Sequence, residues 1–265
     1  MGHHNIRFDG DPHALNGAWS PPTSRANFCE EDYALTFFLA EFINSISNIA
    51  YVYLALRYMR GAGNRGIFAP RLDFMSISLL GLGIGSFLFH ASLRYSLEFA
   101  DEFSMLGLTW SMLQASLTIR QPSARARLIS FSLTIIFTTF SAFYVRSPRI
   151  IYQVFAFATG ILVVILRSQY LFHWTQPAFP KAKSCNWNVR TWKGISICLV
   201  GYLLWNIDLE YCAELRNIRQ QLGLPLAWLF ELHGWWHILT AIGASQFMNV
   251  AREVRDEVKQ EEKRR

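Results

Sequence analysis

Long apolar stretches recur along the chain, separated by short polar segments. A helix that crosses the hydrocarbon core of a bilayer needs about 20 predominantly apolar residues. We predict spanning helices over seven stretches close to this length: Thr36–Tyr58, Asp73–Leu93, Leu97–Thr118, Leu128–Val145, Ile150–Leu171, Trp192–Cys212 and Leu226–Val250. The segments between them are too short for a soluble domain. The pattern therefore predicts an all-α integral membrane protein, a bundle of seven transmembrane helices.

The predicted spans divide the chain into three parts. Residues 1–35 form an N-terminal segment with an acidic cluster, residues 36–250 form the bundle, and residues 251–265 form a charged tail. Lys and Arg collect in alternate connections and in the tail, and cytoplasmic loops carry an excess of these residues. Because an odd number of spans places the two ends on opposite sides, we predict a cytoplasmic C-terminus and a lumenal N-terminus.

The composition agrees with lipid surroundings. Apolar residues make up 52% of the 265 residues and charged residues only 17%, whereas water-soluble domains carry about 25% charged residues. The net charge of +6 could indicate nucleic-acid binding, but the basic residues lie in short clusters between apolar runs. We therefore expect contact with membrane lipid, no nucleic-acid partner and no obligatory protein partner.

Histidines within the predicted spans indicate a metal site. The second span ends in GIGSFLFHASL, which contains His90, and the seventh contains ELHGWWHILT, with His233 and His237 at i and i+4 on one helical face. In the predicted orientation all three lie in the lumenal half of the membrane. Ionisable residues inside a membrane are candidates for functional sites. Three imidazoles and an open position are the ligand set of a hydrolytic zinc site. The alternative is that each histidine satisfies a backbone carbonyl or a Trp.

Two further polar residues lie at the same predicted depth. Asp101 lies near the start of the third span, in LEFADEFSM, and Ser86 lies one turn before His90. Asp101 could accept a proton from water or orient a histidine. Ser86 could donate a hydrogen bond to the oxyanion formed at an attacked carbonyl. Alternatively, Ser86 is one of the small residues in GLGIGS that let helices approach closely.

A second polar cluster, NFCEEDYALTFFLAEF, lies at the start of the first span. Asn27, Glu30, Asp32 and Glu41 offer oxygen ligands for a hard cation such as calcium, although their spacing is not that of an EF-hand. The alternative is a helix start in which Asn27 is the N-cap and Glu30 completes a capping box. Glu41 favours the cation site, because it lies inside the apolar run and needs a partner.

Two of the four cysteines fall on the predicted lumenal side. Cys29 precedes the first span, and Cys212 ends the sixth. This side is oxidising, so a disulfide can persist there. From topology alone, a Cys29–Cys212 disulfide and two free thiols both stay open.

Four segments together resemble the alkaline ceramidases, in the same order and at comparable spacing: NFCEEDY…AEFINSISN, GSFLFHASL…ADE, WNIDLEYC and ELHGWWHILTAIG. The resemblance extends from about Trp19 to Gly243. It implies a multi-pass enzyme of the endoplasmic reticulum or Golgi that hydrolyses ceramide to a sphingoid base and a fatty acid, with amide synthesis as the possible reverse reaction. The wider superfamily of seven-span zinc hydrolases includes the adiponectin receptors.

The resemblance also implies roles for individual residues. Three histidines would bind zinc: His90, His233 and His237. Asp101 would activate water, Ser86 would stabilise the oxyanion, and Cys29 and Cys212 would form a disulfide. Calcium would be bound by four side chains and one main-chain carbonyl, in chain order Asn27, Phe28 (carbonyl), Glu30, Asp32 and Glu41. The animal pattern has Asp where Asn27 stands and Asn where Asp32 stands, an exchange that keeps the ligand number and total charge.

Two other functions stay open. A related seven-span protein could act on another lipid, or could be a receptor with a vestigial site and negligible turnover. A proton or metal transporter is the second alternative, because intramembrane Asp and His residues also line such pathways. Against a transporter, the acidic residues and histidines gather on one side of the bilayer and offer no path through it.

Overall fold

The computed structural model describes residues 11–60 and 72–264. Every regular element in these ranges is a helix, in the order α1 (Phe42–Ser47), α2 (Ile49–Arg60), α3 (Phe74–Ser92), α4 (Tyr95–Thr118), α5 (Ser123–Arg146), α6 (Ile150–His173), α7 (Lys181–Glu210), α8 (Cys212–Leu222), η2 (Leu226–Phe230) and α9 (Leu232–Arg264). The first ten residues of the predicted N-terminal segment and the last residue of the predicted tail lie outside the described residues. The predicted all-α class is confirmed for the described chain.

Each predicted span overlaps a helical stretch, but fewer helices in the described ranges meet a strict criterion for crossing a membrane. By length and composition, α3, α5 and α6 are long and apolar enough. The pair α7 and α8, bent by 91°, adds a fourth if it is one broken span. α4 carries Glu98, Asp101 and Glu102 in its first turns. The apolar helices indicate a membrane protein.

The first and last helices begin later than the predicted spans. Residues 36–41 are not helical, because the N–H groups of Ala40 and Glu41 donate to carbonyls at the end of α3. Helix α1 therefore begins after Glu41. Near the other end, the predicted start at Leu226 is a short 3-10 helix, η2, and α9 begins six residues later at Leu232.

The charged segment after residue 250 continues α9 as far as Arg264. Three glutamates four residues apart share one face of this helix and pair with basic residues of other elements. The pairs are Glu253 with Arg190, Glu257 with Lys183 and Glu261 with Arg120. This segment therefore ties α9 to α7 and to the α4–α5 connection.

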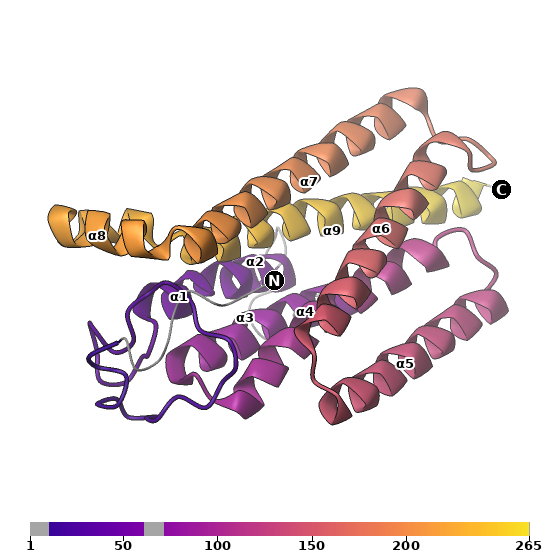
Figure 1. The fold of residues 1–265 in the computed structure, drawn as a ribbon. Helices are drawn as coiled ribbons and strands as arrows, with labels where there is room; N and C mark the ends of the chain where they lie inside the picture. The colour runs from indigo at the N-terminus through magenta and orange to yellow at the C-terminus, as the bar shows by residue number, and fades with distance from the viewer. Residues whose placement is uncertain (1–10, 61–71, 265) are drawn as a thin grey trace.

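The helices form a bundle in which α9 and α3 have central positions. α7 packs along α9, α3 packs along α4, and α1 and α2 lie against both α3 and α9 (Figure 1). α5 packs on α4 and leaves most of its apolar surface exposed. An exposed apolar face of this length suits contact with lipid. The main apolar core lies among α2, α3, α4, α6 and α9.

Non-helical chain covers one end of the bundle. Residues 11–41 gather there beside α8, while the C-terminus lies at the opposite end (Figure 1). A second apolar cluster joins this segment to the helices, with Phe28 and Tyr33 packed among Phe89, Leu93 and Leu209. The polar site lies directly beside this cluster.

Candidate active site

Three histidines meet where the end of α3 faces the start of α9. One ligand nitrogen from each of His90, His233 and His237 lies within 4.8 Å of the other two. The ring centroids of these residues are 4.6–5.1 Å apart. All three side chains are buried. The structure thus brings together the three imidazoles that the sequence singled out.

The environment of His90 suits a metal ligand. Its Nδ1 lies 2.5 Å from Glu41 Oε2. Its Nε2 is buried and has no hydrogen-bond partner among the residues that the structure describes. A histidine whose second nitrogen is held by a carboxylate is the usual arrangement at protein metal sites. The partnerless Nε2 among two further imidazoles is the observation that fits a metal ion here.

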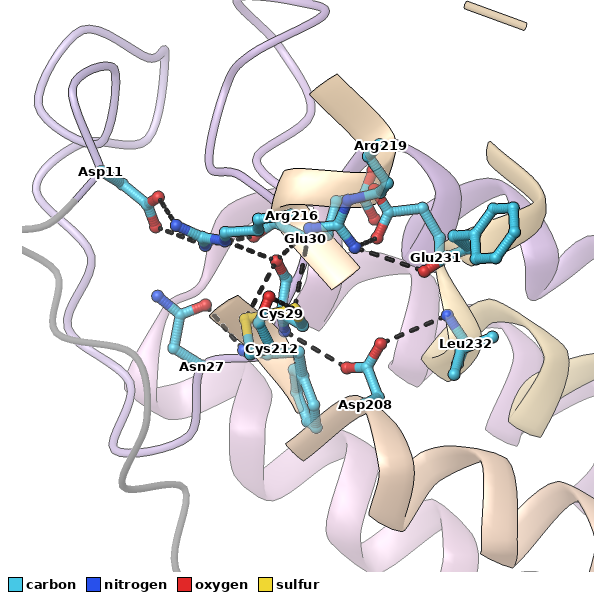
Figure 2. Close-up of a disulfide and its surroundings, with 12 residues drawn as sticks. Asp11, Asn27, Cys29, Glu30, Asp208, Cys212, Arg216, Arg219, Glu231 and Leu232 are labelled. Atoms are coloured by element: carbon cyan, nitrogen blue, oxygen red, sulfur yellow. Dashed lines mark hydrogen bonds and ion pairs between the residues drawn. A yellow bond between two sulfur atoms is a disulfide. The ribbon is translucent and has the colours of Figure 1, made fainter. Parts of the chain in front are cut away.

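Asp208 positions the start of α9, and with it His233. One carboxylate oxygen accepts the N–H of Leu232 at 3.2 Å, and the other accepts the N–H of Cys29 at 3.3 Å (Figure 2). The backbone N–H of His233 also donates to this carboxylate. The first N–H groups of a helix lack partners within it, and a negative charge there is favourable. Asp208, which comes from α7, therefore caps α9 from outside that helix.

Ser86 and Asp101 form a pair beside the histidines. Ser86 is buried in α3 one turn before His90, and its hydroxyl donates to the carboxylate of Asp101 in α4. The structure thus places Ser86 one turn from an imidazole of the cluster and brings Asp101 into contact with Ser86.

The acidic residues of the N-terminal segment also converge. The side chain of Asn27 donates to Asp32, and the N–H of Phe28 lies 3.1 Å from Glu41 Oε1. All of these side chains are buried. One oxygen of Asp32 is buried without a hydrogen-bond partner in the described part of the chain. Asn27, Phe28, Asp32 and Glu41 are therefore linked by hydrogen bonds in this buried segment, while the histidines are the one group of His, Cys, Asp and Glu side chains in the described residues that is spaced to hold a metal ion.

Glu30 caps a helix, but not the helix that the capping-box interpretation predicted. No helix begins at Asn27, so that interpretation is wrong. Instead, Glu30 accepts the N–H groups of Ile43 at 2.6 Å and Asn44 at 2.8 Å. These donors belong to the first turn of α1. Glu30 caps a helix twelve residues further along, because residues 31–41 fold back against α3 before α1 starts.

Burial favours the protonated form of the carboxyl groups in this segment. Burial, followed by the carboxylates of Glu41 and Asp11, raises the pKa of Asp32 to about 8. Burial and the neighbouring Glu41 also raise the pKa of Glu30. A bound divalent cation would favour the ionised carboxylates. The buried oxygen of Asp32, which has no hydrogen-bond partner among the described residues, is the observation in this segment that would suit a cation.

Cys29 and Cys212 form a disulfide that joins this segment to the start of α8, with their Cα atoms 5.3 Å apart. Arg216 and Arg219 converge on it, and their guanidinium groups donate to the carbonyl of Cys29 at 2.9 and 2.7 Å (Figure 2). Arg216 also pairs with Asp11. The disulfide and the two arginines anchor the acidic segment against α8.

The aromatic ring of Phe28 connects the acidic group to the histidines. It stacks on the ring of His233, with centroids 3.9 Å apart. Glu41 makes a second connection, because one of its oxygens faces the N–H of Phe28 and the other faces His90. The two groups of residues therefore form one continuous site.

Ser47 belongs to this site but was not singled out from the sequence. Ser47, the last residue of α1, lies 2.8 Å from His237 Nδ1. A signal was present in AEFINSISN, where polar residues interrupt an apolar run at roughly helical spacing, with Glu41, Asn44 and Asn48 on one face. Glu41, Asn44, Ser47 and Asn48 are all buried.

Comparison with known proteins identifies the family. The model of the ceramidase family matches residues 20–265. The chain is 30% identical to alkaline ceramidase 3 of Mus musculus over 234 residues, which cover 86% of this chain and 82% of the mouse protein. It is 28% identical to alkaline ceramidase YPC1 of Saccharomyces cerevisiae (90% and 78% covered) and 29% identical to the alkaline ceramidase of Arabidopsis thaliana (87% and 83% covered). The resemblance found in the sequence is thereby confirmed, and this chain belongs to the ceramidase family.

Proposed function

We propose that this protein hydrolyses the amide bond of ceramide within a membrane, releasing a sphingoid base and a fatty acid. The observation that carries the proposal is the group of three buried imidazoles beside the Ser86–Asp101 pair. The names of the relatives supply the substrate class. The matched residues cover most of this chain and most of each relative.

The three histidines would hold a zinc ion. His90 offers its partnerless Nε2, and His233 and His237 lie one turn apart at the start of α9. A zinc ion with three histidine ligands polarises a carbonyl and makes water a nucleophile near neutral pH.

Asp101 would accept and return a proton during the reaction, and Ser86 would change its hydrogen-bond partner as Asp101 does so. A serine hydroxyl has one hydrogen, and in the resting arrangement Ser86 donates it to Asp101. When Asp101 accepts the proton of the attacking water, its carboxyl group no longer needs that hydrogen bond. Ser86 is then free to donate to the oxygen of the attacked amide carbonyl. Asp101 next passes the proton to the departing amine nitrogen, and the reverse sequence serves amide synthesis.

The acidic group would hold calcium next to this site. Asn27, Glu30, Asp32 and Glu41 would contribute side-chain oxygens and Phe28 its main-chain carbonyl, as the resemblance implies. The shared Glu41 and the stacked Phe28 would transmit the state of this site to His90 and His233. Calcium would therefore support the geometry of the imidazole cluster.

The same arrangement supports a topology. We propose seven spans with a lumenal N-terminus and a cytoplasmic C-terminus, in the endoplasmic reticulum or Golgi membrane. The disulfide lies at the end of the bundle covered by residues 11–41, and disulfides persist in the oxidising lumen. Glycosylation acceptor sites inserted near residue 15 and at the C-terminus test this topology, because only lumenal sites gain glycan.

The function is tested with full-length protein purified in detergent. Ceramide hydrolysis and bound metal are measured for wild type and for His233→Ala. We expect wild type to carry about one zinc and to release sphingoid base, and the variant to lose both. A folded variant that keeps its zinc and its activity would overturn the assignment. Negligible turnover by zinc-loaded wild type would favour a receptor, and ion flux in vesicles would favour a transporter.

A further inference from the structure

The hydroxyl of Ser47 makes a buried contact with one of the three histidines. Its Oγ lies 2.8 Å from Nδ1 of His237. Ser47 also lies 3.0 Å from the carbonyl oxygen of Asn44, one turn earlier in the chain. Neither Ser47 nor Asn44 has a part in the hydrolysis proposed above.

The available hydrogen atoms determine the direction of this contact. Ser47 has one hydroxyl hydrogen, and it donates that hydrogen to the carbonyl of Asn44. Towards His237 the hydroxyl can therefore only accept. Nδ1 of His237 must carry the hydrogen, which leaves Nε2 with its lone pair free to bind a metal ion.

The carbonyl oxygen of Asn44, which accepts the hydroxyl of Ser47, has a second donor. The side chain of Asn48 donates to this carbonyl at 2.8 Å and holds it in place.

Close packing of α1 against α9 makes the contact possible. Gly234 follows His233 on α9, and a Cβ atom there would lie 2.9 Å from a methyl carbon of Ile43 and 3.6 Å from Cβ of Ser47. A larger residue at position 234 would push the two helices apart. The glycine therefore lets Ser47 reach the histidine one turn along α9.

We propose that Ser47 is a positioning residue, which fixes the tautomer and the ring orientation of His237 so that Nε2 faces His90 and His233 and binds zinc. α1 would then orient two ligands, with Glu41 before its first residue holding His90 and Ser47 at its end holding His237. This inference rests on the proposed zinc site. Residues that hold the second nitrogen of a metal-binding histidine change metal affinity about 10–100-fold when removed.

The test compares matched variants by zinc affinity rather than by activity. Apo-protein is titrated with zinc against a chelator of known affinity. Ser47→Thr and Ser47→Val have the same shape and differ in the hydroxyl alone. We expect Ser47→Thr to bind zinc within a few-fold of wild type, and both Ser47→Val and Ser47→Ala to bind about 10–100-fold more weakly.

Ser45→Ala is the matched control. Ser45 is buried in the same helix and donates to the carbonyl of Glu41, as Ser47 does to that of Asn44. We expect its zinc affinity to be unchanged. Equal affinities for the Thr and Val variants, or an equal loss in Ser45→Ala, would overturn the role of Ser47. Failure of wild type to bind zinc, or of His237→Ala to weaken it, would instead overturn the proposed zinc site.

Discussion

The carboxylate of Asp208 offers a sharp test of how the site is held together. It receives N–H groups from two separate segments, Cys29 at 3.3 Å and Leu232 at 3.2 Å, and it is almost fully buried. Asp208→Ala would leave these donors without an acceptor at the junction of the acidic segment, α7 and α9. The variant should therefore loosen the acidic segment and the first turn of α9 together.

The structure gives the expected size of this effect. A hydrogen bond to a charged group contributes about 1.5–3 kcal/mol, so the bonds from Cys29 and Leu232 alone amount to roughly 3–6 kcal/mol for Asp208→Ala. Asp208→Asn keeps one accepting oxygen and should lose roughly half as much. For a chain of this size, 1 kcal/mol lowers the unfolding temperature by roughly 2–4 °C, so Asp208→Ala should unfold at least about 6 °C below wild type.

The assay is thermal unfolding of detergent-purified protein followed by tryptophan fluorescence, with zinc content measured in parallel. Asp256→Ala is the control, because Asp256 is exposed on α9 and pairs with the exposed Lys259 of the same helix at 3.8 Å. We expect it to unfold within about 2 °C of wild type. If Asp208→Ala also unfolds within that margin and keeps its zinc, the carboxylate does not hold the start of α9.

Three further predictions follow from the same site. Ser86→Ala should lower the rate of ceramide cleavage about 10²–10³-fold and leave zinc content unchanged, since it removes a donor to the carbonyl oxygen; an unchanged rate would exclude that role. Cys212→Ser should lower the free energy of unfolding by about 4–5 kcal/mol, because the disulfide closes a loop between residues 183 positions apart. Cys185→Ser, which removes an exposed free thiol, should have no effect, and equal stability of both variants would contradict the prediction. Because the pKa of Asp32 is raised to about 8, the folded calcium-free protein holds this proton more tightly than the unfolded chain, so its stability should fall as the pH rises from about 4 to 8. Calcium should therefore raise the unfolding temperature more at pH 8 than at pH 5, and Asp32→Asn should reduce this difference, while the raised pKa of Glu30 keeps part of it.

The apolar pattern predicted the positions of the helices well, because each long apolar run in this chain forms a helix. The apolar pattern did not predict the residues at which α1 begins and at which α9 begins and ends. Residues 36–41 are apolar enough to extend the first helix, yet their N–H groups pair with the end of α3 instead. Such a long-range hydrogen bond leaves no trace in local composition. The segment after residue 250 is polar, and its ion pairs with α7 likewise depend on which helices become neighbours.

The candidate site was predicted to different depths. The imidazole cluster could be predicted, because two histidines lie four residues apart on one helix and a third lies at matching depth. Helical spacing and span orientation can both be inferred from sequence. Ser47 was not found, because a serine in an apolar helix is ordinarily a packing residue. Its role depends on the 2.8 Å distance between Ser47 Oγ and His237 Nδ1, which the close packing of α1 against α9 at Gly234 allows.

Removing zinc and adding it back is the most direct test of the proposed zinc-dependent hydrolysis of ceramide. Protein stripped with a chelator should lose ceramide hydrolysis, and added zinc should restore it in proportion until about one ion is bound per chain. His237→Ala, treated in the same way, should recover no activity. Stripped wild type that still hydrolyses ceramide at the original rate would contradict a zinc centre formed by His90, His233 and His237.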